Sequence, residues 1–306
     1  MKIYVMYTKS SFTSEQIESL EGVGEVIFCE EIKKDLNYPY MNDDADKVLM
    51  VDPDWYDWNI DKEHLSKVAN LKGVALATTA YDWIDLEYCR ENDIVVTNTP
   101  KYSTSSVAEY AVFLMMALAK KFPMQIKNNY ETKYNDEMLS TEIKGKTVGL
   151  VGLGTIGEKI ADMCNGLGMN VIYWNRSEKK NNYKRVEIEE IFKTADFIFP
   201  AFSTNDETKK LITDDLINMM NNQSLINVVN NSKEIFNHEL MLEKAKRGIV
   251  NYAFEKYDDK NISDYEGNVM VSAPYAFYTK ESIERLMALW VSNTIETING
   301  HCENSL

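Results

Sequence analysis

The amino-acid sequence predicts an α/β protein made of two domains, each built on a doubly wound parallel sheet with helices on both faces. Three observations predict this fold class. The chain has 306 residues, which is enough for two separate hydrophobic cores. Short apolar runs alternate with helical patterns along most of its length. A glycine-rich turn at 152–157 lies between an apolar run and the start of a helix.

The first third of the chain alternates between strand and helix patterns. The expected strands are Lys2–Tyr7, Glu25–Cys29, Lys47–Val51, Val74–Thr78 and Ile94–Thr97. Helical patterns lie between them, at Ser14–Leu20 and Asp61–Asn70. Because strands joined through helices run parallel, this alternation predicts one parallel sheet. A longer helix is expected from about Ser105 to Lys121, apolar on much of its circumference and therefore buried between the domains.

A second unit is expected to begin near Gly145. Its first strand leads into the motif Gly-Leu-Gly-Thr-Ile-Gly and then into a helix. In a dinucleotide site of this kind, Gly152 allows the turn, Gly154 lets the backbone approach a pyrophosphate, and Gly157 lets the helix pack on the strand. The start of the helix offers free N–H groups to the phosphates. A glycine turn that binds nothing is the alternative.

Further strands are expected after this turn, and a last helix closes the chain. The strands are Asn170–Trp174, Phe197–Phe199, Ser224–Val229 and Gly248–Phe254. The helix, Lys280–Ile298, is apolar over a length that allows it to return to the first domain.

Composition excludes several classes of partner. The formal net charge of −15 argues against nucleic acid and against an anionic membrane. The four cysteines are scattered without a CxxC pair, which argues against a zinc site and fits a reducing compartment. No apolar run is long enough to span a bilayer, and the N-terminus does not resemble a signal peptide. We therefore expect a cytoplasmic protein without a metal.

A series of short motifs runs along nearly the whole chain. They are Ala80–Leu86, Asn98–Ser103, Val107–Glu109, Gly152–Gly157, Ala195–Asp196, Glu207–Thr208, Leu225–Val228 and Pro274. In this order and spacing the chain resembles the D-isomer-specific 2-hydroxyacid dehydrogenases. The resemblance implies two Rossmann/flavodoxin-like domains with an interdomain cleft: a discontinuous substrate domain, 1–99 plus 276–306, and a dinucleotide-binding domain, 100–275.

The catalytic positions that this resemblance implies are changed. The family uses an arginine that holds the substrate carboxylate, a histidine that delivers a proton, and an acid that orients the histidine. Asn230 stands where the arginine should be, and Tyr275 stands where the histidine should follow Pro274. The acid falls near 256–260, with Asp259 as the nearest candidate.

These changes alter the expected chemistry. Arginine to asparagine removes a fixed cation and a bidentate clamp. Histidine to tyrosine replaces a group with a reference pKa near ~6.5 by one near ~10, although tyrosine can still donate a proton to a developing alkoxide. None of the three histidines, His64, His238 and His301, matches the catalytic position, and structural roles are expected for them.

The cofactor is predicted from the end of the second strand of the dinucleotide unit. NAD-selective sites carry an acid there. This chain has the neutral Asn175, followed by Arg176 and Ser177, which can bind a 2′-phosphate. We therefore expect NADP(H) to be preferred over NAD(H). The alternative is that Arg176 is an ordinary solvated cation.

The resemblance implies further contacts. Those to the cofactor are Thr155 and Ile156 at the pyrophosphate, Phe202 and Ser203 beside the nicotinamide, Val228, Val229 and Asn230 lining the same pocket, Glu255 at the carboxamide and Thr208 on the adenosine side. Those to the substrate are the backbone of Thr79 and Ala80, and Tyr102, which is equally consistent with a packing role. The resemblance also implies a homodimer, because this family pairs its subunits through the helix near 105–121.

Three functions fit these observations. The favoured one is an NADP(H)-linked oxidoreductase with a rebuilt active site, which transfers hydride between nicotinamide and a small oxo or hydroxy compound. The second is a catalytically inactive nicotinamide-nucleotide-binding sensor or interaction protein. The third is a conventional 2-hydroxyacid dehydrogenase, for which loss of acid–base catalysis alone costs roughly 10²–10⁴-fold in rate.

Overall fold

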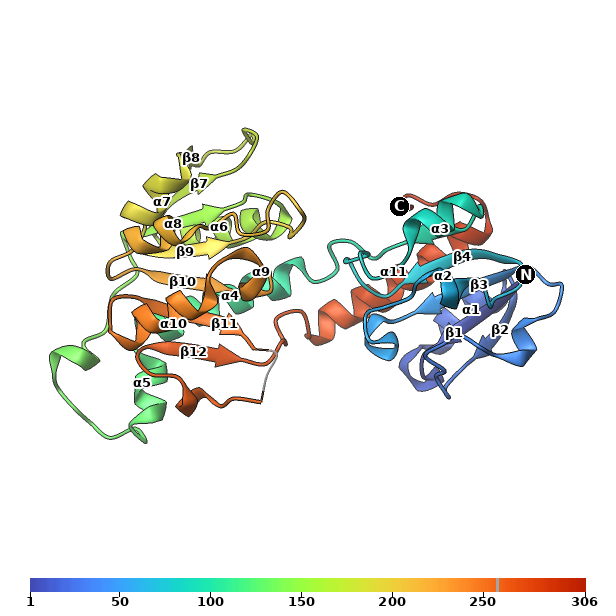
Figure 1. Ribbon diagram of the computed structural model, residues 1–306, viewed down its shortest axis with the longest axis horizontal. Coiled ribbons are helices and arrows are strands. Elements are labelled where there is room, and N and C mark those ends of the chain that lie inside the picture. The colour runs from blue at the N-terminus through green and yellow to red at the C-terminus, as the bar shows by residue number, and fades with distance from the viewer. Residues whose placement is uncertain (257–258) are drawn as a thin grey trace. The chain divides into compact units, whose positions relative to one another are not determined.

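The computed structural model describes residues 1–256 and 259–306 of the chain. The chain divides into two compact units (Figure 1): a first unit, Met1–Ser103 with Lys280–Leu306, and a second unit, Thr104–Thr279. The boundaries predicted from the sequence, after 99 and after 275, fall a few residues earlier. Both units are α/β and both sheets are parallel, which confirms the predicted fold class.

The first unit has a five-stranded sheet with the order β2-β1-β3-β4-β5. The strands are β1 Lys2–Met6, β2 Glu25–Phe28, β3 Lys47–Val51, β4 Leu71–Leu76 and β5 Val95–Thr97. The helices are α1 Ser14–Glu21, α2 Lys62–Leu65, α3 Leu86–Glu91 and α11 Lys280–Ile298, with short 3₁₀ helices η1 Lys9–Ser11, η2 Pro39–Met41 and η3 Pro53–Tyr56. Helix α11 packs on this sheet, where the buried Trp290 donates from Nε1 to the carbonyl of Ala75 at 2.8 Å.

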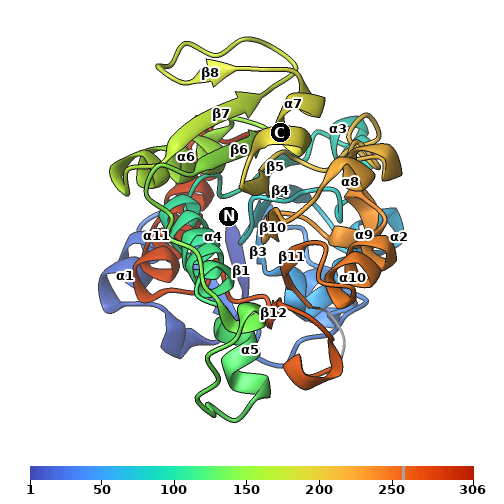
Figure 2. The ribbon, with the colours of Figure 1, turned by 90° about the vertical axis from the view of Figure 1, so that its left-hand side faces the viewer.

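The second unit has a seven-stranded sheet with the order β12-β11-β10-β9-β6-β7-β8. The strands are β6 Thr147–Val151, β7 Asn170–Trp174, β8 Lys184–Arg185, β9 Phe197–Pro200, β10 Ser224–Asn227, β11 Asn251–Glu255 and β12 Val269–Ser272. The helices are α4 Thr104–Ala119, α5 Phe122–Lys127, α6 Thr155–Gly166, α7 Ile188–Thr194, α8 Asp214–Met219, α9 Ser232–Ile235 and α10 His238–Lys246, with η4 Asp136–Met138 and η5 Ile262–Asp264. Figure 2 shows α4 and α6 on one face of this sheet and α8, α9 and α10 on the other.

One predicted helix of the first unit is much shorter than expected. The pattern at 61–70 forms α2 only over Lys62–Leu65. The fully buried ammonium of Lys47 donates to the carbonyl of Ala69 at 2.8 Å, and Asn70 takes a φ of +53°. The N–H groups of Lys67 and Val68 bond to carbonyls only three residues back, at 3.3 and 3.1 Å, and the left-handed Asn70 then leads the chain into β4, so the helix ends early.

Two predicted strands of the second unit have different limits. The run at 224–229 leaves the sheet after Asn227, because the Asn227 side chain donates to the carbonyl of Asn230 and turns the chain. The run at 248–254 begins as a strand only at Asn251. Gly248 instead ends α10 with a φ of +69°, a conformation that glycine adopts without strain.

The strand order of the second unit places a ligand site at one edge of the sheet. The chain runs from β6 outward through β7 to β8, and then crosses back to β9 on the other side of β6. The order therefore reverses between β6 and β9. In open parallel sheets, ligands bind at the carboxyl ends of the strands at such a switch point. The glycine turn at 152–157 leaves β6 at this point.

Candidate functional site

The three glycines of the turn have different tasks. Gly152 has a φ of +98°, and a Cβ built on it would lie 2.6 Å from the carbonyl oxygen of Ala201. A Cβ on Gly157 would lie 2.5 Å from the carbonyl oxygen of Gly152. Gly154 has nothing within 4 Å of such a Cβ. Two glycines are therefore needed by the fold, and the third leaves an open place beside the backbone.

The open place at Gly154 faces the start of α6. Gly154 is the N-cap of this helix, and no side chain caps it there. Both Gly154 and Thr155 are exposed. An uncapped helix start with exposed N–H groups and a positive dipole end suits a phosphate group. The residues present therefore fit a dinucleotide pyrophosphate.

Alanine substitutions should separate these tasks. We expect Gly154→Ala to fold with a stability within about 1 kcal/mol of the wild type, since its backbone is extended and its surroundings are open. It should weaken dinucleotide binding at least tenfold, because the methyl group occupies the place of the phosphate. Gly152→Ala should instead lower the stability of the fold by about 2 kcal/mol or more. Chemical denaturation and dinucleotide titration measure the two effects. Equal loss of stability in both variants would contradict this division.

A hydrogen bond joins the residue that follows β7 to the glycine turn. Asn175 accepts from the N–H of Leu153 at 3.2 Å and donates to the carbonyl of Ser177 at 2.8 Å. The side chain of Arg176 is 81% exposed and forms an ion pair with Glu207. The neutral Asn175 thus shapes the turn, and Arg176 stands in solvent beside it.

Arg185 on β8 was not singled out from the sequence. It donates to the carbonyl of Asn175 at 3.0 Å and to that of Arg176 at 3.4 Å. It therefore adds a second cation to the loop after β7. Its two-residue strand gives no recognisable pattern, so no sequence signal could have identified it.

The loop after β9 closes on itself beside the turn. Thr208 accepts from the N–H of Asn205 at 2.8 Å and donates to the carbonyl of Ser203 at 2.7 Å, so it shapes this loop. A Cβ on Gly152 would lie 3.0 Å from the Cβ of Phe202, which places Phe202 next to the glycine turn. The structure thus brings the predicted residues of β9 and β6 together.

The end of β10 and the segment after it carry two amide side chains, Asn227 and Asn230. Asn230 accepts at Oδ1 from the hydroxyl of Thr204 at 2.7 Å, and its carbonyl accepts from Nδ2 of Asn227 at 2.9 Å. Nδ2 of Asn230 and Oδ1 of Asn227 are buried without a hydrogen-bond partner among the described residues. Each such atom costs about 1–3 kcal/mol unless a water or a bound molecule supplies its partner. Val228 and Val229 lie between them in the chain, Val228 buried and Val229 partly buried.

The segment after β12 carries Tyr275. Its side chain is 62% exposed, and its ring centroid lies 6.1 Å from that of Tyr278. The next residue, Ala276, donates from its N–H to Oε1 of Glu255 at 2.9 Å. Glu255, at the end of β11, therefore fixes the backbone beside Tyr275. Asp259 is exposed and follows 257–258, which lie outside the described residues.

Burial raises the pKa of Glu255 to about 7, whereas the carboxyl group has a reference value of 4.5. In the folded state Glu255 therefore holds its proton more tightly than in the unfolded state. Its contribution to stability is fully present below about pH 4.5 and is lost as the pH rises through about 7.

Glu255→Gln should remove this pH dependence. We expect the variant to exceed the wild type in free energy of unfolding by about 2 kcal/mol near pH 8, and the difference to shrink towards zero near pH 4.5. Denaturant titrations at the two pH values measure it. Glu266→Gln, at an exposed carboxylate 2.7 Å from Lys246, serves as the control and should give no gain. A gain that is the same at both pH values would contradict the assignment.

The predicted substrate residues lie in the first unit, beyond the carboxyl ends of β4 and β5. Thr79 donates from Oγ1 to the carbonyl of Thr99 at 2.9 Å, and Ala80 accepts at its carbonyl from Trp83 at 2.9 Å. Both Thr79 and Ala80 are exposed. Burial raises the pKa of Tyr102 to about 12, so its hydroxyl stays protonated.

The histidines occupy structural positions. His64 lies 2.7 Å from Asp61 in the capping box of α2, and His301 is exposed. His238 is the first residue of α10, and Asn237 caps that helix. Across the described ranges, 1–256 and 259–306, no group of histidine, cysteine and carboxylate side chains could hold a metal ion. The same ranges contain no helix that could cross a membrane.

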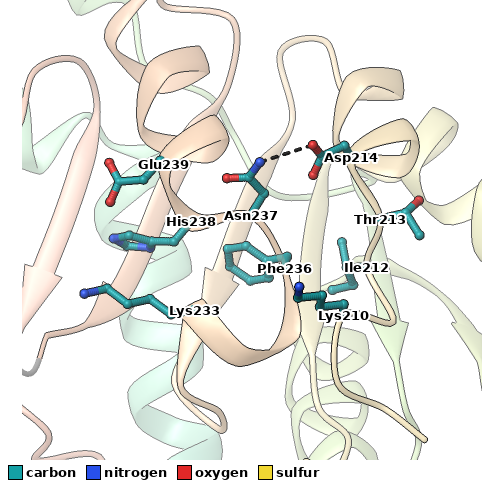
Figure 3. Close-up of a pocket in the computed structure, with 9 residues that line it drawn as sticks. All are labelled: Lys210, Ile212, Thr213, Asp214, Lys233, Phe236, Asn237, His238 and Glu239. Atoms are coloured by element: carbon teal, nitrogen blue, oxygen red, sulfur yellow. Dashed lines mark hydrogen bonds between the residues drawn. The ribbon is translucent and has the colours of Figure 1, made fainter.

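A pocket of about 580 Å³ lies in the second unit, and none of the predicted site residues lines it (Figure 3). It is lined by Lys210, Ile212, Thr213, Asp214, Lys233, Phe236, Asn237, His238 and Glu239. His238 in its wall is 9% exposed, and its Nδ1 lies 2.9 Å from the hydroxyl of Tyr252. The pocket is therefore connected to buried polar groups of the sheet.

Sequence comparisons agree on one family. The model of the D-isomer specific 2-hydroxyacid dehydrogenase NAD binding domain matches residues 112–254. A protein of Staphylococcus aureus strain N315, classed as a 2-hydroxyacid dehydrogenase, is 29% identical over 257 residues, which are 79% of this chain and 80% of that protein. A protein of Staphylococcus saprophyticus classed in the same way is 26% identical over 301 residues, 93% and 90% of the two chains.

Comparisons with solved structures support the same fold. An acyclic imino acid reductase in complex with NADPH and D-Arg has a TM-score of 0.83 and 24% identity, with both chains fully covered. A glyoxylate reductase from Paecilomyes thermophila has a TM-score of 0.83 and 17% identity, covering 100% of this chain and 98% of that one. D-lactate dehydrogenase from Aquifex aeolicus, complexed with NAD and lactic acid, has a TM-score of 0.76 and 21% identity, covering 98% and 96%.

Proposed function

The chain belongs to the D-isomer-specific 2-hydroxyacid dehydrogenase family, and from this premise we propose that it is an NADP(H)-linked oxidoreductase with a rebuilt active site. It would transfer hydride between nicotinamide and a small oxo or hydroxy compound. The observation that carries the proposal is the open, uncapped start of α6 at Gly154, at the same sheet edge as the unpartnered amides of Asn227 and Asn230.

The second unit has residues for each part of the dinucleotide. Thr155 and Ile156, at the start of α6, would hold the pyrophosphate, and Arg176 with Ser177 would bind the 2′-phosphate. Glu255 would contact the carboxamide, since its raised pKa lets it donate as well as accept near neutral pH. When bound, the nicotinamide supplies the hydride. The solved neighbours include an NADPH complex and an NAD complex, so the cofactor preference rests on Arg176 and Asn175.

We assign substrate binding and proton donation to the residues that replace the family's arginine and histidine. Nδ2 of Asn230 would donate to the group beside the reacting carbonyl of the substrate, because its Oδ1 is engaged by Thr204. Tyr275 would deliver the proton to the carbonyl oxygen as that oxygen gains charge. The hydrogen bond between Glu255 and the N–H of Ala276 would hold the Tyr275 backbone in place.

A second candidate is a nicotinamide-nucleotide-binding protein that does not turn over. The observation that favours it is the replacement of two family catalytic positions, Asn230 for arginine and Tyr275 for histidine, beside an intact glycine turn. This candidate shares the cofactor site with the first, so only turnover separates the two.

Cofactor titration followed by a substrate screen tests the proposal. NADPH and NADH are titrated while energy transfer from tryptophan to nicotinamide is followed. The screen should include 2-oxo acids, neutral oxo compounds and imines, since one solved neighbour is named as an imino acid reductase. Saturation by NADPH followed by turnover supports the first candidate, and saturation without turnover supports the second. If neither nucleotide binds, both are wrong.

The homodimer remains a prediction. Large apolar side chains between the start of α4 and Leu139 are exposed, with Phe113 at 51%, Tyr130 at 65%, Tyr134 at 99% and Leu139 at 73%. Exposed apolar surface of this kind marks association sites. We expect sedimentation at micromolar concentration to give a dimer, and Phe113→Glu to shift it towards monomer. A monomeric wild type would refute the prediction.

A further inference from the structure

The two unpartnered atoms at the end of β10 and just after it are one donor and one acceptor, and the hydrogen bonds around them fix which is which. Thr204 donates to Oδ1 of Asn230 at 2.7 Å, which leaves Nδ2 as the free donor. Asn227 donates from Nδ2 to the carbonyl of Asn230 at 2.9 Å and to Oγ of Ser232 at 2.7 Å. Its Oδ1 is therefore the free acceptor.

A buried chain of hydrogen bonds keeps Asn227 in this orientation. The hydroxyl of Tyr252 donates to Oγ of Ser232 at 3.0 Å. A tyrosine has one proton to give, so His238 must donate from Nδ1 to the Tyr252 oxygen, 2.9 Å away. Ser232 is 5% exposed and Tyr252 is fully buried, and buried networks of this kind resist reorientation. Figure 3 shows His238, the residue through which this series of hydrogen bonds reaches the wall of the pocket.

By the resemblance, the donor Asn230 stands at the position where the family's arginine would hold a carboxylate, and the acceptor Asn227 lies three residues before it. Asn230 supplies no positive charge, and a carboxylate buried beside the Asn227 oxygen would face a lone pair. A carboxamide differs from a carboxylate by offering one acceptor and one donor. It is complementary to Nδ2 of Asn230 and Oδ1 of Asn227 at the same time.

We propose that Asn230 and Asn227 select substrates whose reacting carbonyl is adjacent to a carboxamide, so that the enzyme reduces 2-oxo amides in preference to 2-oxo acids. This inference rests on the proposed function. The C=O π bond opens as hydride from the reduced nicotinamide forms the new C–H bond. The oxygen takes a proton from Tyr275, which regains one from water. The products are a 2-hydroxy amide and the oxidised nucleotide.

Pyruvamide and pyruvate form a matched pair, because they differ only in the amide and the carboxylate. We expect kcat/KM with NADPH to be at least tenfold higher for pyruvamide. Calorimetric binding of each compound to the enzyme saturated with NADP⁺ should show the same order without requiring turnover. A wild type that prefers pyruvate, or that binds NADP⁺ but neither compound, overturns the inference.

Asn230→Arg should invert the preference, because it restores the cation and the bidentate clamp. Asn230→Ala should weaken the binding of pyruvamide at least fivefold without improving the binding of pyruvate. Asn231→Ser keeps the cap of α9 and serves as the control, with the wild-type preference expected. Unchanged preference in Asn230→Arg overturns the inference, provided that NADPH still saturates the variant. If the wild type does not bind NADPH, the proposed function fails and this inference with it.

Discussion

Tyr275→Phe is expected to lower kcat about 10²–10⁴-fold on a carbonyl substrate, while the dissociation constant for NADPH changes less than twofold. Removing the hydroxyl removes the proton that the developing alkoxide needs. The ring remains, so packing of the loop after β12 is kept. The side chain is 62% exposed, and the change should leave stability within about 0.5 kcal/mol. Steady-state kinetics and cofactor titration measure the two effects.

Tyr278→Phe is the matched control. Its side chain is 64% exposed, close to the value for Tyr275, and the two ring centroids are 6.1 Å apart. We expect Tyr278→Phe to keep kcat within a factor of about two. An equal loss in both variants would indicate a general effect on the loop. If Tyr275→Phe leaves turnover on a carbonyl compound unchanged, Tyr275 is not the acid.

The same variant separates carbonyl from imine chemistry. A protonated imine already carries the charge that hydride neutralises, so its reduction does not need a proton at the moment of hydride transfer. Turnover of imines that survives Tyr275→Phe, together with loss of turnover on carbonyl compounds, would assign Tyr275 to the carbonyl oxygen specifically.

Local patterns predicted the parts of the fold that depend on local sequence. Strands β3 and β7 and helix α11 have the predicted limits. Gly152 and Gly157 were identifiable because their roles follow from backbone geometry, which leaves no space for a side chain. The short α2 could not be predicted, because the tight turns at Lys67 and Val68 and the left-handed Asn70 that follow it leave no recognisable pattern in the sequence.

The candidate site, like the fold, could be predicted from the sequence only in part. The resemblance supplied positions such as 230 and 275, but not the contacts that determine what those residues offer. The bonds from Thr204 to Asn230 and from Tyr252 to Ser232 join segments 26 and 20 residues apart, and no spacing rule identifies them. These two contacts decide which amide atom stays free. Asp259 remains a prediction, since it is exposed and adjoins residues outside the described ranges.

The largest effect on cofactor choice is expected from Arg176→Ala. This variant should bind NADPH about 10–100-fold more weakly, since hydrogen bonds to a charged group contribute about 1.5–3 kcal/mol. Its affinity for NADH, which lacks the 2′-phosphate, should fall less than threefold. The preference for NADPH should fall as salt rises, because the side chain is 81% exposed and its charge is screened. Parallel titrations with the two nucleotides measure the ratio.

A substitution at Glu207 should have the opposite effect on NADPH binding. Glu207 forms an ion pair with Arg176 while 73% exposed, and exposed pairs contribute at most about 1 kcal/mol, so a phosphate can displace it. Glu207→Gln should therefore strengthen the binding of NADPH several-fold without changing the binding of NADH. Lys184→Ala removes an exposed cation of the neighbouring β8, which pairs with Glu190, and should leave the ratio unchanged. Equal losses for both nucleotides in Arg176→Ala would exclude a 2′-phosphate contact, and Arg185 would then be the cation to test.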